Sequence, residues 1–174
     1  TVLCIPNTLI YTFSKKIKKK SFELGAQNSH FSKDYGPYTG SVNASMLKKS
    51  GARYVILGHS ENRFEGETNK LIKRKIEAAL NNKLNVIFCI GETYKENFMK
   101  KTFLVLKNQL NGSIDKKFNF KKIIIAYEPV WSIGTGKIPK SNDVIKIFNF
   151  IKKEFKSIFK KNLSPVILYG GSVN

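Results

Sequence analysis

The chain has 174 residues, of which 41% are hydrophobic and 25% are charged, a composition typical of globular domains. This balance excludes disordered, collagen-like and disulfide-scaffold proteins. Lys and Arg number 31 against 12 Asp and Glu, so the formal net charge is +19. Such a charge raises nucleic acid or an anionic membrane surface as a possible partner.

Lysine carries almost all of this positive charge, because only Arg53, Arg63 and Arg74 are arginines. Lys occurs with many Asn, Ile and Phe residues, and all four have A/T-rich codons. No basic cluster is interleaved with aromatic residues, as nucleic-acid-binding surfaces usually are. Codon bias that fills solvated surfaces with lysine therefore explains the charge better than a polyanion site does.

The two cysteines and the apolar segments indicate the compartment. Cys4 and Cys89 lie far apart within apolar runs, where a thiol behaves as a small buried hydrophobic group. No apolar stretch reaches the roughly 18 residues of a membrane span, and the first residues do not have the pattern of a signal peptide. We therefore expect a cytoplasmic protein with no membrane partner.

Six short apolar runs predict β-strands. They are mostly continuous rather than alternating, which is typical of parallel strands that are covered on both faces. The runs span residues 2–5, 22–26, 54–57, 86–90, 123–127 and 166–169.

Amphipathic helices are predicted between the strands. Apolar residues recur at helical spacing over residues 68–84, 103–110 and 144–158, with a shorter helix at 43–50, and Ser141 or Asn142 could cap the last long helix. The alternation predicts an α/β fold with a parallel sheet, and its spacing agrees with a βα barrel or a doubly wound sheet. No linker divides the chain, so we expect a single domain over residues 1–174.

Polar residues directly follow several of the predicted strands, where parallel α/β proteins place their functional groups. Glu128 ends the strand at 123–127 and could act as a base on a carbon acid, or form a structural ion pair. His59 follows the strand at 54–57, immediately before residues that could begin a helix. A helix N-terminus disfavours the imidazolium, so His59 could donate a hydrogen bond as a neutral group, or simply pack.

Two glycine-rich turns offer free backbone N–H groups, at residues 134–136 and 170–172. Such groups bind phosphate, although tight turns without a ligand use the same residues. A carboxylate, a neutral histidine and two anion sites on one sheet edge indicate proton abstraction beside the carbonyl of a small phosphorylated substrate. No cluster of metal-ligand residues is present in the sequence pattern, so no metal is expected.

Five segments resemble, in order, the signature segments of the triosephosphate isomerase family. They are GAQN (25–28), YVILGHSENR (54–63), CIGET (89–93), AYEPVWSIGTGK (126–137) and LYGGSVN (168–174). The resemblance implies a (β/α)₈ TIM barrel and the interconversion of dihydroxyacetone phosphate and D-glyceraldehyde 3-phosphate, in glycolysis and gluconeogenesis. It implies no metal and no organic cofactor.

The resemblance also implies roles for individual residues. Glu128 is similar to the family's base, His59 to its electrophile and Glu61 to its supporting acid. Gly134 and Ser172 resemble residues that bind the substrate phosphate. The closing lid spans residues 129–137, and its members include Pro129, Val130, Trp131, Gly136 and Lys137.

A homodimer is implied by the loop at residues 36–40, which resembles the family's interdigitating loop. Its tip carries Tyr38 and Thr39. Exposed aromatic residues on such loops are typical anchors of interfaces.

The sequence departs from the family pattern in three places. Asn62 stands where the family commonly has an arginine, and Ile138 and Pro139 replace small residues at the second hinge of the lid, where proline could stiffen the chain. The resemblance covers strands two to seven, so the barrel is expected to be incomplete over residues 1–174, with the first and eighth βα units absent. We expect these residues alone to have little isomerase activity. The alternatives are a lysine-rich barrel that binds a polyanion and a catalytically inactive copy.

Overall fold

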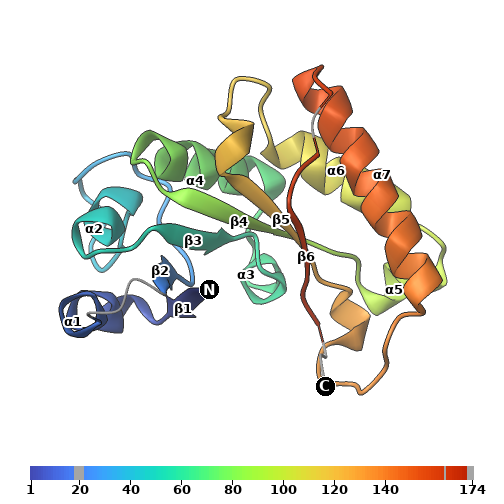
Figure 1. Ribbon diagram of the computed structural model, residues 1–174, viewed down its shortest axis with the longest axis horizontal. Helices are drawn as coiled ribbons and strands as arrows, with labels where there is room; N and C mark the ends of the chain where they lie inside the picture. Colours follow the sequence, from blue (N-terminus) through green and yellow to red (C-terminus); the bar gives the residue numbers. More distant parts are fainter. Residues whose placement is uncertain (18–21, 163, 172–174) are drawn as a thin grey trace.

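The computed structural model describes residues 1–17, 22–162 and 164–171, and these contain one curled sheet of six parallel strands (Figure 1). Strand order in space follows strand order in the chain, from β1 to β6. A doubly wound sheet reverses its strand order at a switch point, so this arrangement favours a barrel segment. The strands are β1 (Val2–Ile5), β2 (Glu23–Ala26), β3 (Tyr54–Leu57), β4 (Asn85–Ile90), β5 (Ile123–Tyr127) and β6 (Ile167–Tyr169).

Helices connect the strands, and the three longest pack side by side along one side of the sheet in the order α4, α6, α7 (Figure 1). The α-helices are α1 (Ile10–Lys16), α2 (Ala44–Lys49), α3 (Ser60–Phe64), α4 (Asn69–Asn81), α5 (Tyr94–Phe98), α6 (Thr102–Ser113) and α7 (Ser141–Phe159). Single 3₁₀ turns occur at η1 (Asn7–Leu9), η2 (Phe120–Lys122) and η3 (Val130–Ser132).

The predicted strands and long helices are confirmed, with shifts at their ends. β2 and β6 begin one residue later than predicted, and β4 begins one residue earlier, at Asn85. The cap predicted for α7 is wrong. Lys140 takes the N-cap position, where its carbonyl accepts from the backbone N–H groups of Asp143 and Val144, and its side chain makes no cap because an ammonium has no acceptor atom.

Apolar side chains on both faces of the sheet explain why the strands have continuous hydrophobic runs. Along β4, Val86 and Phe88 belong to the main core, which includes residues of α4, α6 and α7. Ile87 and Cys89 face the opposite way, into a second cluster that consists of strand residues only. The sheet therefore packs against helices on one face and against its own strands on the other.

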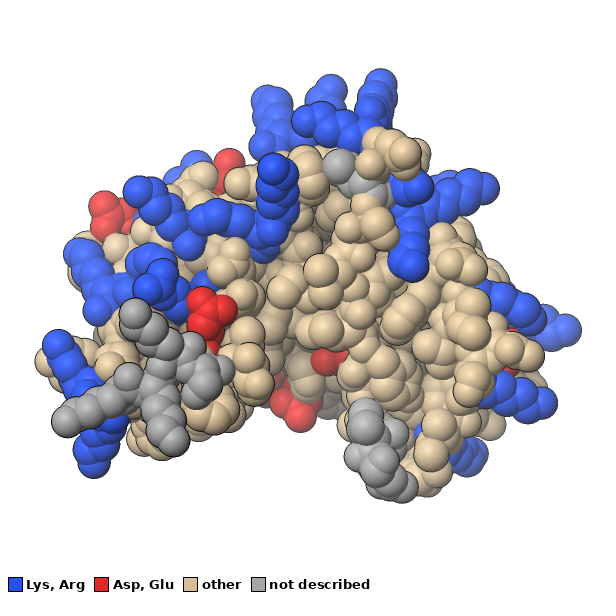
Figure 2. All heavy atoms as spheres, in the orientation of Figure 1, with Lys and Arg blue, Asp and Glu red and all other residues tan. Residues whose placement is uncertain are grey.

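Lysines cover much of the outer surface. Figure 2 shows Lys and Arg side chains projecting along the edges of the molecule, with few acidic side chains on this face. No helix in the described ranges is long and apolar enough to cross a membrane.

The ends of β4 and β5 approach so closely that Gly91 has no room for a side chain. A Cβ atom there would lie 1.7 Å from the carbonyl oxygen of Glu128. Gln109 of α6 holds the same residue, because its side-chain oxygen accepts from the Gly91 N–H and its side-chain nitrogen donates to the Gly91 carbonyl, both at 2.9 Å. The carboxyl end of β4 thus limits where Glu128 can lie.

Replacing Gly91 by alanine should therefore lower the free energy of unfolding by about 3 kcal/mol or more, at the upper end of overpacking costs. The matched variant is Gly136→Ala. Its new Cβ atom would meet nothing within 4 Å, but an alanine at a φ of +70° costs about 1 to 2 kcal/mol. Urea denaturation of the two variants measures the difference. Equal losses would show that the two strand ends separate easily.

Candidate active site

Glu128 and His59 meet at the carboxyl ends of the parallel strands. Glu128 directly follows β5 and is 8% exposed, and His59 lies just after β3. The two side chains approach within 3.4 Å, measured from Nε2 of His59 to Oε1 of Glu128. The structure thus brings together the two residues that the sequence singled out for proton transfer.

Backbone geometry places the Glu128 carboxylate. Its N–H donates to the carbonyl of Ile90 at 2.8 Å, which extends the β4–β5 ladder by one residue. On the other side, Gly170 follows β6, and a Cβ atom there would lie 3.0 Å from Cγ of Glu128. Small residues after both neighbouring strands therefore leave space for this side chain.

The tautomer of His59 follows from its position as the N-cap of α3. Its Nδ1 accepts a hydrogen bond from the backbone N–H of Glu61 at 3.3 Å, so Nδ1 carries the lone pair and Nε2 the proton. The Nε2–H then faces Glu128. The carboxylate of Glu61 is exposed and lies 3.7 Å from Nδ1.

Arg63 fixes the loop that carries His59, although the sequence analysis assigned it no role. Its guanidinium donates to the carbonyl of Gly58 at 2.7 Å, to the side chain of Asn69 at 2.8 Å and to the carbonyl of Cys89 at 3.2 Å. Burial lowers the pKa of Arg63. Arg63 therefore connects the end of β3 to the end of β4. In the sequence, only its place in the YVILGHSENR segment indicates a role for it.

The segment after Glu128 is held by Glu92, another residue without a predicted role. The buried Glu92 carboxylate accepts from Nε1 of Trp131 at 2.8 Å, from the side chain of Asn97 at 3.1 Å and from the hydroxyl of Tyr127 at 3.2 Å. Burial raises the pKa of Tyr127, and the charge of Glu92 adds to this effect. The carboxylate thereby ties Trp131 to β5 and α5.

The remaining predicted residues follow Glu128 along residues 129–137, which we call the lid segment. Pro129 and Val130 lead into η3, and the N–H of Val130 donates to the carbonyl of Glu92 at 3.1 Å. Gly134 and Gly136 have φ of 69° and 70°, and a Cβ atom at either position would meet nothing within 4 Å. Lys137 places its ammonium 5.5 Å from the ring centre of Tyr94.

Ser172 lies outside the described residues, so its predicted pairing with Gly134 stays a prediction.

Near the site, burial raises the pKa of the Cys89 thiol, and the charge of Glu128 contributes. In the described part of the chain, no group of His, Cys, Asp and Glu has the arrangement of a metal site.

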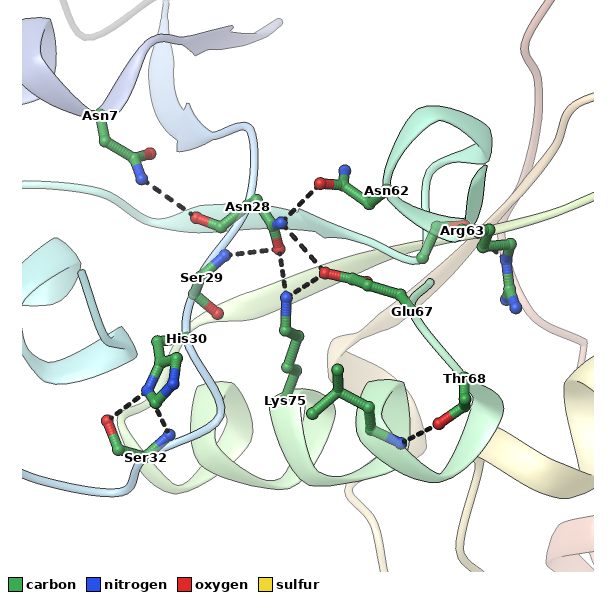
Figure 3. Close-up of polar contacts among 12 residues, drawn as sticks. Asn7, Asn28, Ser29, His30, Ser32, Asn62, Arg63, Glu67, Thr68 and Lys75 are labelled. Carbon is green, nitrogen blue, oxygen red and sulfur yellow. Dashed lines mark hydrogen bonds and ion pairs between the residues drawn. The ribbon is translucent and has the colours of Figure 1, made fainter. Parts of the chain in front are cut away.

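A buried polar network lies beside this site and links the loops after β2 and β3 (Figure 3). Lys75 of α4 pairs with Glu67 and donates to Asn28 at 3.0 Å. Asn28 in turn donates to Glu67 at 3.2 Å and to Asn62 at 2.8 Å. Asn62, a departure from the family pattern, thus takes part in the network as an acceptor.

Comparisons with known proteins agree with this geometry. The family model described as Triosephosphate isomerase matches residues 1–174. The triosephosphate isomerase of Bartonella tribocorum is 42% identical over 174 residues, which is 99% of this chain and 68% of the relative. That of Dictyoglomus thermophilum is also 42% identical, over 178 residues, 99% of this chain and 71% of the relative.

A solved structure supports the fold. The crystal structure of triosephosphate isomerase from Bartonella henselae matches with a TM-score of 0.89 and 39% sequence identity, covering 99% of this chain and 70% of that one. The six strands therefore correspond to part of a TIM barrel, and the chain belongs to the triosephosphate isomerase family.

Proposed function

We propose that this protein interconverts dihydroxyacetone phosphate and D-glyceraldehyde 3-phosphate through an enediolate. The observation that carries the proposal is the convergence of a buried carboxylate, Glu128, with the Nε2 atom of His59 at 3.4 Å. A carbon acid next to a carbonyl needs one group to remove its proton and another to stabilise the oxygen as charge develops. In this proposal, Glu128 removes the proton and His59 stabilises the oxygen.

In the proposed reaction, Glu128 removes a proton from C1 or C2 of the substrate and returns it to the other carbon. His59 donates its Nε2 proton toward the carbonyl oxygen and then transfers protons between the two enediolate oxygens. The neutral tautomer suits this task, because its Nδ1 already accepts the N–H of Glu61. Glu61 acts as a supporting acid beside the ring.

The lid segment closes over the bound substrate in this proposal, and Gly134 and Ser172 bind the phosphate. A Cβ atom at Gly134 would meet nothing within 4 Å, so there is open space beside this residue. Closure excludes water, which protects an enediol phosphate from losing its phosphate group. No organic cofactor or metal takes part, and the reaction belongs to glycolysis and gluconeogenesis in the cytoplasm.

We further propose that residues 1–174 form one partial barrel domain and that the protein acts as a homodimer. The loop at residues 36–40 projects Tyr38, which is 39% exposed although its ring centre lies 4.6 Å from that of His30, with the two rings tilted by 49°. Thr39 beside it is exposed. Phe64 on α3 is 94% exposed, which is unusual for a large apolar side chain without a partner surface. A second copy of the protein could cover both features.

The variant Glu128→Asp tests the catalytic proposal in the full-length gene product. The shorter side chain withdraws the carboxylate by about 1 Å, which should lower kcat on the order of 10²-fold with little change in KM. The same exchange at the exposed Glu65 is the control and should leave kcat as it is. An unchanged kcat in Glu128→Asp would remove this residue from the mechanism.

The tautomer of His59 is testable by ¹⁵N-detected NMR of the imidazole at pH 7.5. The expected spectrum shows an unprotonated Nδ1 and a protonated Nε2, because protonating Nδ1 would break its hydrogen bond to the Glu61 N–H. A ring protonated on both nitrogens, or on Nδ1 alone, would contradict the proposed role.

Sedimentation at micromolar concentration and physiological ionic strength tests the dimer, since low salt would exaggerate repulsion between highly charged copies. The full-length protein should sediment as a dimer, and Tyr38→Ser should weaken association by at least tenfold if Tyr38 is an interface anchor. Tyr11→Ser makes the same change at another exposed tyrosine and should have no effect. A monomeric parent protein would refute the proposal.

A further inference from the structure

A cavity of about 530 Å³ lies between α5, α6, the end of the lid segment and the first turns of α7. This volume falls within the range of small-molecule sites, which is roughly 300 to 1,000 Å³. In Figure 1, the chain after η3 passes beside α5 before it enters α7. We call it the α5–α7 cavity.

The α5–α7 cavity is separate from the proposed catalytic centre. Neither Glu128 nor His59 lines it. It is formed by Tyr127 at the end of β5 and by elements that follow β4 and β5. Trp131 and Tyr127 form the wall between the two sites, and both donate hydrogen bonds to Glu92.

The walls of this cavity are apolar and its rim is cationic. Phe103, Ile138 and Ile147 supply apolar surface. Three lysines, Lys100, Lys140 and Lys146, also line the space.

One acidic group, Asp143, also lines the cavity, and it lies 3.4 Å from Lys146. The residues that line the cavity therefore carry a net positive charge. α7 adds to it, because this 19-residue helix begins at the cavity without a side-chain cap on its first turn. The chemistry of the lining matches a molecule with an apolar body and one anionic group.

We propose that the α5–α7 cavity binds a small organic anion with an apolar body, and that its occupancy slows the isomerase by restraining the lid segment. The ligand would place its apolar part between Phe103 and Ile147 and its anionic group among the lysines of the rim. It would then contact Trp131, within the lid segment, and Pro139, two residues beyond its end. The regulatory half of this inference rests on the proposed isomerase function, whereas the binding half does not.

The binding half is tested with 6-phenylhexanoate and two matched probes, 6-phenylhexan-1-ol and 6-phenylhexylamine, which differ only in the charge of the terminal group. Trp131 is the only tryptophan in the sequence and lines the cavity, so its fluorescence on excitation at 295 nm reports occupancy. The carboxylate should bind the full-length protein at least tenfold more tightly than the alcohol, and the amine should bind most weakly. Equal affinities for the three probes would overturn the proposal.

The double variant Lys140→Gln/Lys146→Gln locates the site. Both side chains are exposed and outside the catalytic groups, so the protein should fold and keep its basal kcat. Carboxylate affinity should fall about three- to tenfold, as expected for two exposed charges, and alcohol affinity should stay constant. The control Lys153→Gln/Lys156→Gln removes two exposed lysines farther along α7 and should change neither affinity. Equal losses in the two double variants would place the anion elsewhere.

Steady-state kinetics test the regulatory half. Added 6-phenylhexanoate should lower kcat at saturating substrate, and Lys140→Gln/Lys146→Gln should weaken this inhibition in parallel with binding. A rise in KM at constant kcat would place the probe in the catalytic centre, and binding without inhibition would refute the effect on the lid. Failure of the proposed function would appear separately, as an unchanged kcat in Glu128→Asp.

Discussion

The arrangement around Glu128 and His59 depends on one buried carboxylate, that of Glu92. It accepts hydrogen bonds from Tyr127 on β5, Asn97 on α5 and Trp131 in the lid segment. A buried carboxylate is tolerated only when such donors replace its hydration, so the three elements and the charge stabilise one another. Because Trp131 supplies one of the three donors, movement of the lid segment requires the carboxylate to exchange a partner.

A second set of buried polar contacts holds the other half of the site. Lys75, Glu67 and Asn28 join α4 to the loops after β2 and β3. Burying an ion pair gains little stability by itself, but removing one partner leaves an uncompensated charge and costs several kcal/mol. The network therefore acts mainly as a constraint on geometry. Together with Arg63 it orients the segment that begins at His59.

The sequence was sufficient to predict the architecture and the placement of Glu128 and His59 at the carboxyl ends of neighbouring parts of the sheet. Strands β1, β3 and β5 have the predicted bounds, because parallel strands covered on both faces have continuous apolar runs. Glu128 and His59 could be found because each directly follows such a strand. The predicted cap of α7 was wrong. Lys140 caps this helix only through its backbone carbonyl, so its side chain does not indicate the position of the cap.

Residues that support the site could not be found in this way, because their partners are distant in the sequence. Gln109 contacts Gly91 from 18 positions away, Arg63 contacts Cys89 from 26 and Lys75 contacts Asn28 from 47. Two of these three contacts involve backbone groups of the partner residue. Because every residue type has a backbone carbonyl, the identity of the partner does not indicate such a contact. Only the fold places these residues in contact, so local patterns of hydrophobicity and charge do not indicate them.

The sequential strand order has a consequence for how the chain assembles. Every strand from β2 to β6 pairs with the strand made immediately before it, so each pairing closes a loop of a single strand-helix unit. The entropy lost in closing such loops grows only with the logarithm of their length. As the chain leaves the ribosome, each new strand finds its partner already synthesised, and the sheet can grow in one direction. The side chain of Glu128 therefore gains one of its neighbours, Gly170, only when β6 has joined the sheet.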